Sequence, residues 1–150
     1  MTNLPKNNER GFTIIEVMIV AAIMVILTAL AVPSYRNFIV RSVRTQAKST
    51  LMLIADRQEQ FFLDNKAYTG DIKNLGFKGN PMYVDRDGAE VAAASTDRVY
   101  KIQLTNTSAT TYTAQAVPEL HQAAGDTACG TMSLTHAGQR SQSGSGADCW

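Results

Sequence analysis

The feature that most constrains this chain is an apolar run near its N-terminus. From Phe12 to Val32 the only ionisable side chain is that of Glu16. As a helix rising about 1.5 Å per residue, the run reaches roughly 30 Å, which matches the hydrocarbon core of a bilayer. A carboxylate at that depth costs roughly 2.5–3.5 kcal/mol on insertion scales, so Glu16 needs a role that justifies it. A proton relay and a contact within a helix bundle are two such roles.

The charges that flank this run predict its orientation. Lys6 and Arg10 precede it, so the positive-inside rule keeps the N-terminus in the cytoplasm and exports the residues beyond about 33. No small-residue cleavage site closes the run, as one would in a secretory signal peptide, so we expect a retained anchor. Export agrees with the 2 cysteines, Cys129 and Cys149, which favour one disulfide in an oxidising compartment over reactive thiols.

A helical pattern continues beyond the apolar run. Pro33 should kink the helix, but YRNFIVRSVRTQAKSTLMLIADRQEQFF follows without glycine or a further proline. An apolar stripe recurs there at helical spacing, beginning with Tyr35 and Phe38, and the opposite polar face includes Arg41, Arg44 and Lys48. We therefore predict one helix from about Phe12 to Leu63, apolar on all sides in its first half and amphipathic in its second.

The C-terminal half of the chain changes to a period of two. DRVYKIQLT, TTYTAQAV and GTMSLTH alternate apolar and polar residues, which predicts strands of an antiparallel sheet with one buried face. The amphipathic helix would cover that face, giving an α+β fold. Glycine-rich residues from about 64 to 97 predict an irregular connection in which AEVAAAST forms a helical turn. The tail AGQRSQSGSGADCW should be floppy unless a disulfide closing about 20 residues ties it down.

The stretch RGFTIIEVMIVAA resembles the N-terminal signal of type IV pilins and pseudopilins. It combines a short basic leader, Gly11, the aromatic Phe12, and Glu16 four residues further on. The resemblance implies cleavage between Gly11 and Phe12 by a prepilin peptidase, followed by N-methylation of Phe12. It also implies the type IV pilin fold, in which a long N-terminal helix packs on a small antiparallel β-sheet with a disulfide-closed C-terminal loop. Pro33 lies where pilins place a kinking proline.

This resemblance divides the chain into three parts. Residues 1–11 would be a cleaved cytoplasmic leader, residues 12–33 a transmembrane and fibre-core helix, and residues 34–150 the amphipathic helix and a globular periplasmic or extracellular head. The protein would lie in the inner membrane as a single-pass prepilin and later in a pilus on the cell surface. There Glu16 would pair with its own N-terminal amine or with that of a neighbour, and so set the register of assembly.

Most of the remaining chain, outside about residues 79–97, is similar to minor pilins, most closely to the PilE type of Pseudomonas-like Gram-negative bacteria. The similar segments are the helix after Pro33, AYTGDIKNLGF, and DTACGTMSLTHAGQR with the final DCW. We therefore expect a minor pilin that promotes pilus assembly, enters the fibre and serves twitching motility, adhesion and natural transformation. Its implied partners are major and minor pilins, the prepilin peptidase and the inner-membrane assembly platform. Two alternatives are a receptor-type minor pilin that binds DNA or a surface ligand, and a type II secretion pseudopilin.

Other candidate sites are weaker. Arg41, Arg44 and Lys48 share a helix face and could contact DNA phosphates, or could form a solvated or subunit-facing stripe. The balance of 14 Lys+Arg against 13 Asp+Glu does not by itself point to nucleic acid. Neither histidine has a partner at metal-site spacing, and the segment Asp85–Gly88 lacks the final acidic ligand of a calcium loop, so we expect a polar turn there. Catalytic motifs are absent from the sequence, and we expect no enzyme, cofactor or metal.

Overall fold

The computed structural model describes residues 11–150, which form two units. The first is the described part of Met1–Arg36, and the second is Asn37–Trp150. Helix α1 (Ile14–Asn65) contributes to both and agrees with the single long helix predicted from the sequence. Apart from Gly11, the predicted leader of residues 1–11 lies outside the described residues.

The first unit is an exposed apolar helix. Its large side chains have no partner among residues 11–150, as the exposed fractions of 83% for Ile14 and 69% for Leu30 show. The mean hydropathy of its most apolar window is 2.8, so by length and composition α1 can cross a membrane. Pro33 lies inside α1, and the kink predicted there stays a prediction.

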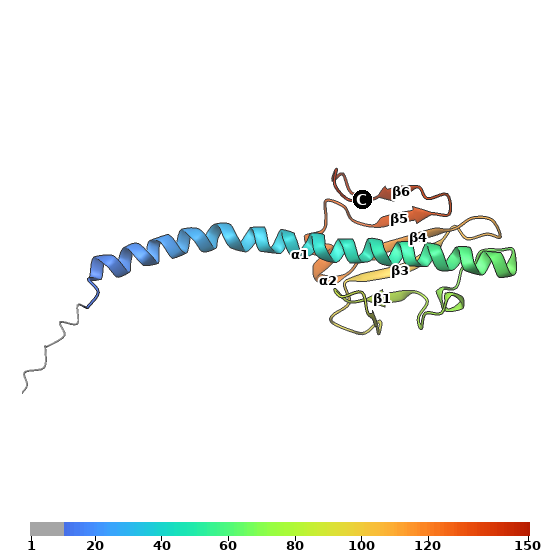
Figure 1. Ribbon diagram of the computed structural model, residues 1–150, viewed down its shortest axis with the longest axis horizontal. Coiled ribbons are helices and arrows are strands. Elements are labelled where there is room, and N and C mark those ends of the chain that lie inside the picture. Colours follow the sequence, from blue (N-terminus) through green and yellow to red (C-terminus); the bar gives the residue numbers. More distant parts are fainter. Residues whose placement is uncertain (1–10) are drawn as a thin grey trace, which may run out of the picture. The chain divides into compact units, whose positions relative to one another are not determined.

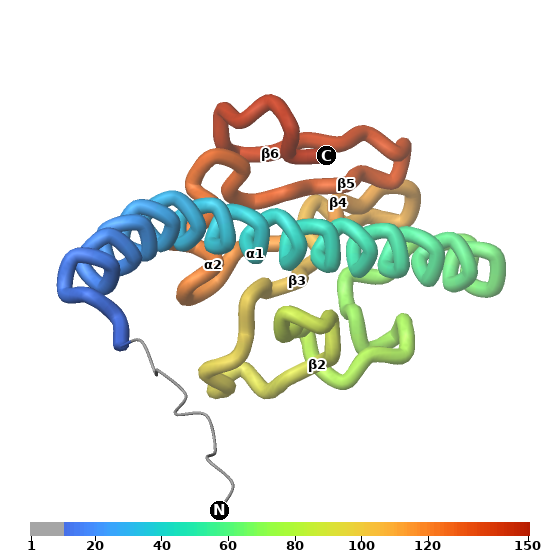
Figure 2. The backbone as a smooth tube through the Cα atoms, turned by 60° about the vertical axis from the view of Figure 1, so that its left-hand side comes forward, coloured from blue at the N-terminus to red at the C-terminus, as the bar shows by residue number. Residues whose placement is uncertain are grey.

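The second unit, called the head below, is an antiparallel sheet with α1 running across one face (Figure 1). The strand order is β2-β1-β3-β4-β5-β6, so each strand pairs with near neighbours in the sequence. The elements after α1 are η1 (Ile72–Leu75), β1 (Met82–Val84), β2 (Glu90–Val91), β3 (Tyr100–Thr105), β4 (Thr113–Pro118), α2 (Leu120–Gly125), β5 (Met132–Thr135) and β6 (Arg140–Gln142). Figure 2 shows the β5–β6 side of the sheet and the β1–β2 side on opposite flanks of α1.

The three strands predicted from alternation are confirmed as β3, β4 and β5. The connection from about 64 to 97, predicted to have little regular structure, holds three short elements that the sequence did not predict, η1, β1 and β2. The AEVAAAST segment begins with β2 and continues in turns rather than forming a helical turn. Asp85 makes the β1–β2 hairpin possible: its Oδ1 accepts the backbone N–H of Asp87 at 3.0 Å and that of Ala89 at 2.9 Å. The predicted polar turn is therefore an Asx-type turn that joins two strands.

The tail is also more ordered than its composition predicts. Its residues form β6, in which Arg140 pairs with Leu134 and Gln142 with Met132. The disulfide that we expected to restrain it is present between Cys129 and Cys149. Backbone pairing and the covalent bond together order a segment rich in glycine and serine.

The core lies between α1 and the inner face of the sheet. From α1 it takes Val43, Ala47, Leu51 and Ile54. The other elements add buried residues on the same side: Ile72, Leu75, Met82, Val84, Tyr100, Ile102, Tyr112, Ala114, Ala116, Met132 and Leu134. The predicted apolar stripe is wrong at its start, because Tyr35 and Phe38 are 67% and 65% exposed. These two residues precede the part of α1 that the sheet covers.

Candidate functional site

The residues of the predicted processing motif are exposed, with Gly11 and Phe12 just before α1 and Glu16 in its first turn. Phe12 is 82% exposed, and Gly11 and Glu16 are exposed as well. The backbone N–H of Glu16 donates to Thr13 Oγ1 at 3.3 Å, so Thr13 caps the first turn. The motif is thus accessible within the described chain, and its cleavage, methylation and register role stay predictions.

Arg44 is buried, contrary to its predicted place on the polar face. Its Nε donates to Asp126 Oδ2 at 3.0 Å and its Nη2 donates to Asp126 Oδ1. Asp126 also accepts from the hydroxyl of Tyr100 at 2.9 Å and from Gln122 Nε2 at 3.2 Å. The same amide of Gln122 donates to the carbonyl of Val40 at 3.1 Å. This network joins α1 to α2 and β3, and it removes Arg44 from the candidate DNA contacts.

The electrostatics of this network follow from burial. The hydrogen bond to Asp126 raises the pKa of Arg44 despite the opposing effect of desolvation, so the guanidinium stays charged. Burial, followed by the negative charge of Asp126, raises the pKa of Tyr100 above its ordinary value, so its hydroxyl stays protonated as a donor. Every buried side-chain polar atom in residues 11–150 has a hydrogen-bond partner. The network is therefore fully satisfied and structural in character.

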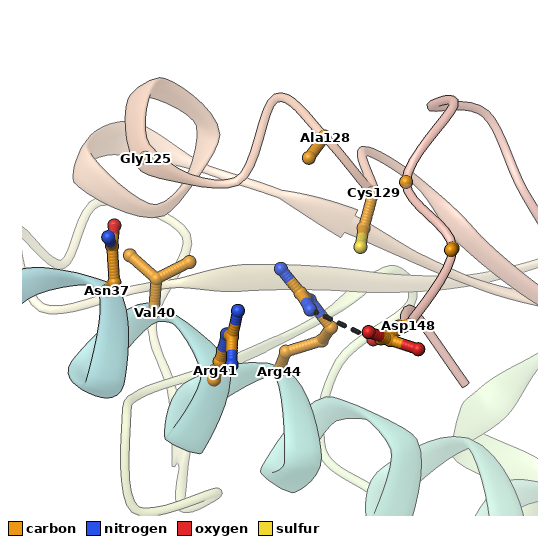
Figure 3. A pocket seen from close by; sticks show the side chains of 10 residues that line it. Asn37, Val40, Arg41, Arg44, Gly125, Ala128, Cys129 and Asp148 are labelled. Atoms are coloured by element: carbon orange, nitrogen blue, oxygen red, sulfur yellow. Dashed lines mark hydrogen bonds between the residues drawn. The ribbon is translucent and has the colours of Figure 1, made fainter.

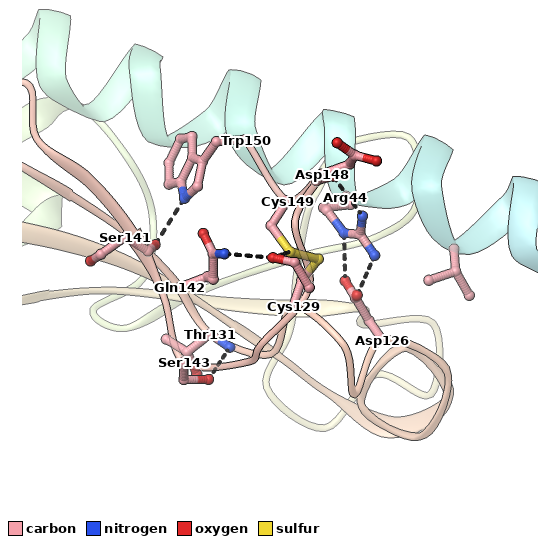
Figure 4. Close-up of a disulfide and its surroundings, with 12 residues drawn as sticks. Arg44, Asp126, Cys129, Thr131, Ser141, Gln142, Ser143, Asp148, Cys149 and Trp150 are labelled. Atoms are coloured by element: carbon pink, nitrogen blue, oxygen red, sulfur yellow. Dashed lines mark hydrogen bonds and ion pairs between the residues drawn. A yellow bond between two sulfur atoms is a disulfide. The ribbon is translucent and has the colours of Figure 1, made fainter.

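The disulfide fastens the chain after β6 to the chain before β5 (Figure 4). Around it, Gly144 N–H donates to Cys129 O at 3.0 Å and Gly146 N–H donates to the carbonyl of Ala128 at 2.8 Å. A Cβ on Gly144 would collide with that same carbonyl, so only glycine allows this close approach. The predicted bridge is confirmed, and it holds a tightly packed loop.

A polar cavity of about 290 Å³ lies where α1 meets α2 and the disulfide loop (Figure 3). Arg41 and Arg44 extend from α1 toward it, and Asp148 lines it from the loop. Arg44 Nη1 donates to the carbonyl of Asp148 at 3.4 Å. Since Arg44 is already bound, Arg41 is the exposed cation at this cavity. Among residues 11–150, no group of three or more His, Cys, Asp or Glu side chains is placed to hold a metal ion.

A second cationic surface combines a residue of α1 with residues of β6 and the C-terminus. We call it the cationic edge and define it as Lys48, Arg140 and Trp150. The guanidinium carbon of Arg140 lies 5.6 Å from the centroid of the Trp150 ring. Partial burial lowers the pKa of Lys48, and the positive charges of Arg44 and Arg140 lower it further. These cations are therefore close enough to repel one another.

No carboxylate of residues 11–150 forms an ion pair with the cations of the cationic edge. Within the described residues, the ion pairs are Arg44 with Asp126 and Arg98 with Glu119. Neither Lys48 nor Arg140 forms one. Helical periodicity indicated Lys48 but not Arg140 or Trp150, because nothing local in the sequence links β6 and the last residue to α1. The sequence offered one signal, a tryptophan directly after a disulfide cysteine.

Two segments of the chain match known protein families. Residues 6–32 match the prokaryotic N-terminal methylation motif, which together with the long apolar helix and the antiparallel sheet defines a type IV pilin. Residues 33–133 match the family described as type IV minor pilin ComP, DNA uptake sequence receptor. That match covers more than half of the chain, so the chain belongs to this family of minor pilins. The predicted membership of the type IV pilins, and of their minor components, is confirmed.

Individual relatives are pilins from several bacteria. The type IV major pilin protein PilA of Myxococcus xanthus is 40% identical over 93 residues, which cover 62% of this chain and 40% of PilA. A type IV major fimbrial protein FimA of Dichelobacter nodosus is 38% identical over 94 residues, covering 61% and 58%. Fimbrial protein EcpC of Eikenella corrodens is 32% identical over 104 residues, covering 68% and 67%. The chain thus spans about half the length of the first curated relatives that it matches.

Among solved structures, a type IV pilin from Shewanella oneidensis is similar at 23% sequence identity. The alignment covers 71% of this chain and 92% of that chain, with a TM-score of 0.47.

Proposed function

We propose that this minor pilin enters type IV pili and binds DNA at the cell surface. The observation that carries the proposal is the match of residues 33–133 to a family of DNA uptake sequence receptors, because that range covers most of the head. It favours the receptor alternative over a role in assembly alone. The function is one of binding and polymer formation, without catalysis, and it serves natural transformation together with twitching motility and adhesion.

The N-terminal unit supports entry into the fibre. In the proposed sequence of events, the prepilin peptidase cleaves between Gly11 and Phe12, and the new amine of Phe12 is methylated. The apolar side chains of α1 are first covered by lipid and then by the helices of other major and minor pilins. The exposed apolar surface of residues 14–32 supports this, because nothing in the described part of the chain covers it.

The disulfide supports the proposed location. Before assembly the protein would span the inner membrane once, with its N-terminus in the cytoplasm and its head in the periplasm, next to the assembly platform. Cys129 and Cys149 form their bond in the head, and the periplasm is an oxidising compartment. After assembly the head would be on the surface of the pilus, where external DNA is accessible.

A binding measurement on the whole protein tests the receptor function. We would titrate the purified full chain, in a non-ionic detergent, into fluorescently labelled duplex DNA and follow the anisotropy. We expect binding at about 50 mM salt that weakens steeply toward about 200 mM, because phosphate contacts release counterions. Duplexes that carry a sequence repeated in the genome of the source organism are expected to bind more tightly than shuffled duplexes. No binding of either at low salt would remove the receptor function.

A deletion strain separates this function from an assembly role. If the protein is a receptor, cells lacking it should keep their pili by electron microscopy and lose DNA uptake. If they lose pili, and regain them when retraction is blocked, the protein biases assembly. Loss of protein secretion with intact pili would favour the pseudopilin alternative.

A further inference from the structure

We infer that the cationic edge, formed by Lys48, Arg140 and Trp150, is the surface on which the head binds the sugar-phosphate backbone of DNA. This inference rests on the proposed function and names the site at which it would act. It also replaces the set predicted from the sequence, because Arg44 is buried and the new members come from β6 and the disulfide loop.

The positive charges of the cationic edge are not balanced by carboxylates of the described residues. Arg44 and Arg98 each have a carboxylate within an ion pair, whereas Lys48 and Arg140 have none among the described residues. The two charges interact, since the positive charge of Arg140 lowers the pKa of Lys48, and like charges this close repel one another. An anion bound between them would relieve that repulsion, and partial burial of Lys48 strengthens the attraction because solvent screens it less.

Trp150 is held in a fixed position within the cationic edge. Trp150 is only half-exposed, because its ring packs against the core cluster and its Nε1 donates to the carbonyl of Ser141 at 2.8 Å (Figure 4). Cys149, the preceding residue, is fully buried in the disulfide. The ring is therefore held in place before any ligand arrives, with the guanidinium of Arg140 over it. A fixed aromatic ring beside cations provides a rigid apolar surface against which a deoxyribose can pack while the cations contact its phosphates.

Arg41 lies on α1 in line with Lys48. It precedes Lys48 by seven residues, which is two helical turns or about 10 Å along α1. About three nucleotide steps of a DNA strand, at about 3.4 Å each along the axis, cover the same length. Arg41 is exposed on the side of α1 that faces the disulfide loop (Figure 3). Arg41 and Lys48 thus form a row that a phosphate backbone could follow, with Arg140 beside it on β6.

Trp150 provides a direct test, because it is the only tryptophan in the chain. The full chain in non-ionic detergent is titrated with an unlabelled mixed-sequence duplex while its intrinsic fluorescence is recorded. We expect saturable quenching that added salt reverses, with the same midpoint as the anisotropy of a labelled duplex. Quenching without that common midpoint would overturn the assignment.

Charge-matched variants then separate the site from net charge. The double variant Lys48→Gln/Arg140→Gln should weaken DNA binding by roughly tenfold or more and reduce the slope of log K against log[salt] by about 1.8, or about 0.9 per phosphate contact. The control is Lys73→Gln/Arg86→Gln, which removes the same charges from exposed positions in η1 and the β1–β2 turn. The control should bind like the parent protein. Thermal unfolding followed by far-UV circular dichroism establishes that both variants are folded.

Each outcome has a distinct meaning. If the parent protein binds no DNA by anisotropy, the proposed function fails and this inference fails with it. If the parent binds DNA without quenching Trp150, and Lys48→Gln/Arg140→Gln binds equally well, the site is wrong while the function stands. Equal weakening by both double variants would reduce the effect to net charge and overturn the site. Normal DNA binding by Lys48→Gln/Arg140→Gln, together with its loss from sheared pili, would assign the surface to an acidic neighbouring pilin instead.

Discussion

At the scale of single residues, Arg44 and Asp126 decide how firmly the helix is attached to the head. Both are buried, and Asp126 accepts hydrogen bonds from side chains of three elements. Replacing Arg44 with Met should lower the free energy of unfolding by about 3–5 kcal/mol, because it leaves a buried carboxylate without its counter-ion. Guanidinium denaturation followed by tryptophan fluorescence measures this.

The matched control for that substitution is Arg41→Met. Arg41 lies one turn earlier on α1 and is exposed, so we expect a change within about 0.5 kcal/mol. A second comparison is the double variant Arg44→Met/Asp126→Leu, which should recover part of the loss because no charge is left buried. Equal stability of Arg44→Met and Arg41→Met would contradict the role assigned to the ion pair.

Tyr112 makes the head sensitive to alkaline pH. Burial raises its pKa from 10.0 to about 12, and the nearby Glu59 and Tyr68 contribute to the rise. Below about pH 10 the phenol is protonated in both the folded and the unfolded chain, and its contribution to stability is complete. Between about pH 10 and pH 12 the unfolded chain loses the proton first, so the free energy of unfolding should fall by about 2 kcal/mol. Denaturation curves recorded across this range, with tyrosinate absorbance, measure the loss.

Substitution identifies the residue responsible for that loss. Tyr112→Phe removes the titrating group, so part of the alkaline decline should disappear, whereas the buried Tyr100 continues to contribute. An unchanged decline in Tyr112→Phe would mean that other groups control it.

Residues differ in how far the sequence could predict their roles. Gly11, Phe12 and Glu16 belong to one contiguous motif, so their pattern can be read without a structure. Arg44 was predicted to be on the polar face, because helical periodicity shows which residues share a face but not which residues they contact. Its partner, Asp126, is 82 residues away in the sequence. Only the tertiary fold brings the two together.

At the scale of elements, the disulfide controls the order of β6. Cys129→Ser/Cys149→Ser opens a loop of about 20 residues, which should lower the free energy of unfolding by about 3 kcal/mol in the chain-entropy model. The three-residue β6 pairs only with β5, so we expect its backbone amides to lose protection from hydrogen exchange. The six-residue strands β3 and β4 lie in the middle of the sheet and should keep theirs. Full protection of β6 in the variant would show that strand pairing alone suffices.

The same contrast explains which elements could be predicted. The residues of α1, β3, β4 and β5 form runs long enough to show a period of 3.6 or 2. β1, β2 and β6 have three, two and three residues, which is too few for any period to be visible. They exist because neighbouring strands and the turn at Asp85 supply their hydrogen bonds. Their composition, rich in glycine, serine and alanine around each strand, therefore gave the wrong expectation.

At the scale of the whole molecule, Glu16 should affect the polymer and not the monomer. Glu16→Val makes the apolar run easier to insert, by roughly 2.5–3.5 kcal/mol, so the amount in the membrane should not fall. Its entry into pili should fall, because the proposed pairing of Glu16 with the Phe12 amine would be lost. Immunoblots of the membrane and sheared-pilus fractions measure both quantities.

Thr28→Val is the control within the same run. Thr28 Oγ1 already donates to the carbonyl of Met24 at 2.6 Å, so its loss removes a polar group without removing a charge. We expect this variant to enter pili like the parent protein. Normal entry of Glu16→Val would remove the proposed register role.

The exposed apolar surface of residues 14–32 implies that these side chains are covered first by lipid and later by neighbouring helices. Lipid tails are fluid and adapt to any shape, whereas a bundle of helices has fixed gaps that only certain side chains fill. A substitution that preserves hydropathy and changes size, such as Ala21→Leu, should therefore leave membrane insertion unchanged. The same substitution should reduce entry into the fibre. Such a variant would accumulate in membranes and be missing from pili, so its fate would map, position by position, where neighbouring helices come close.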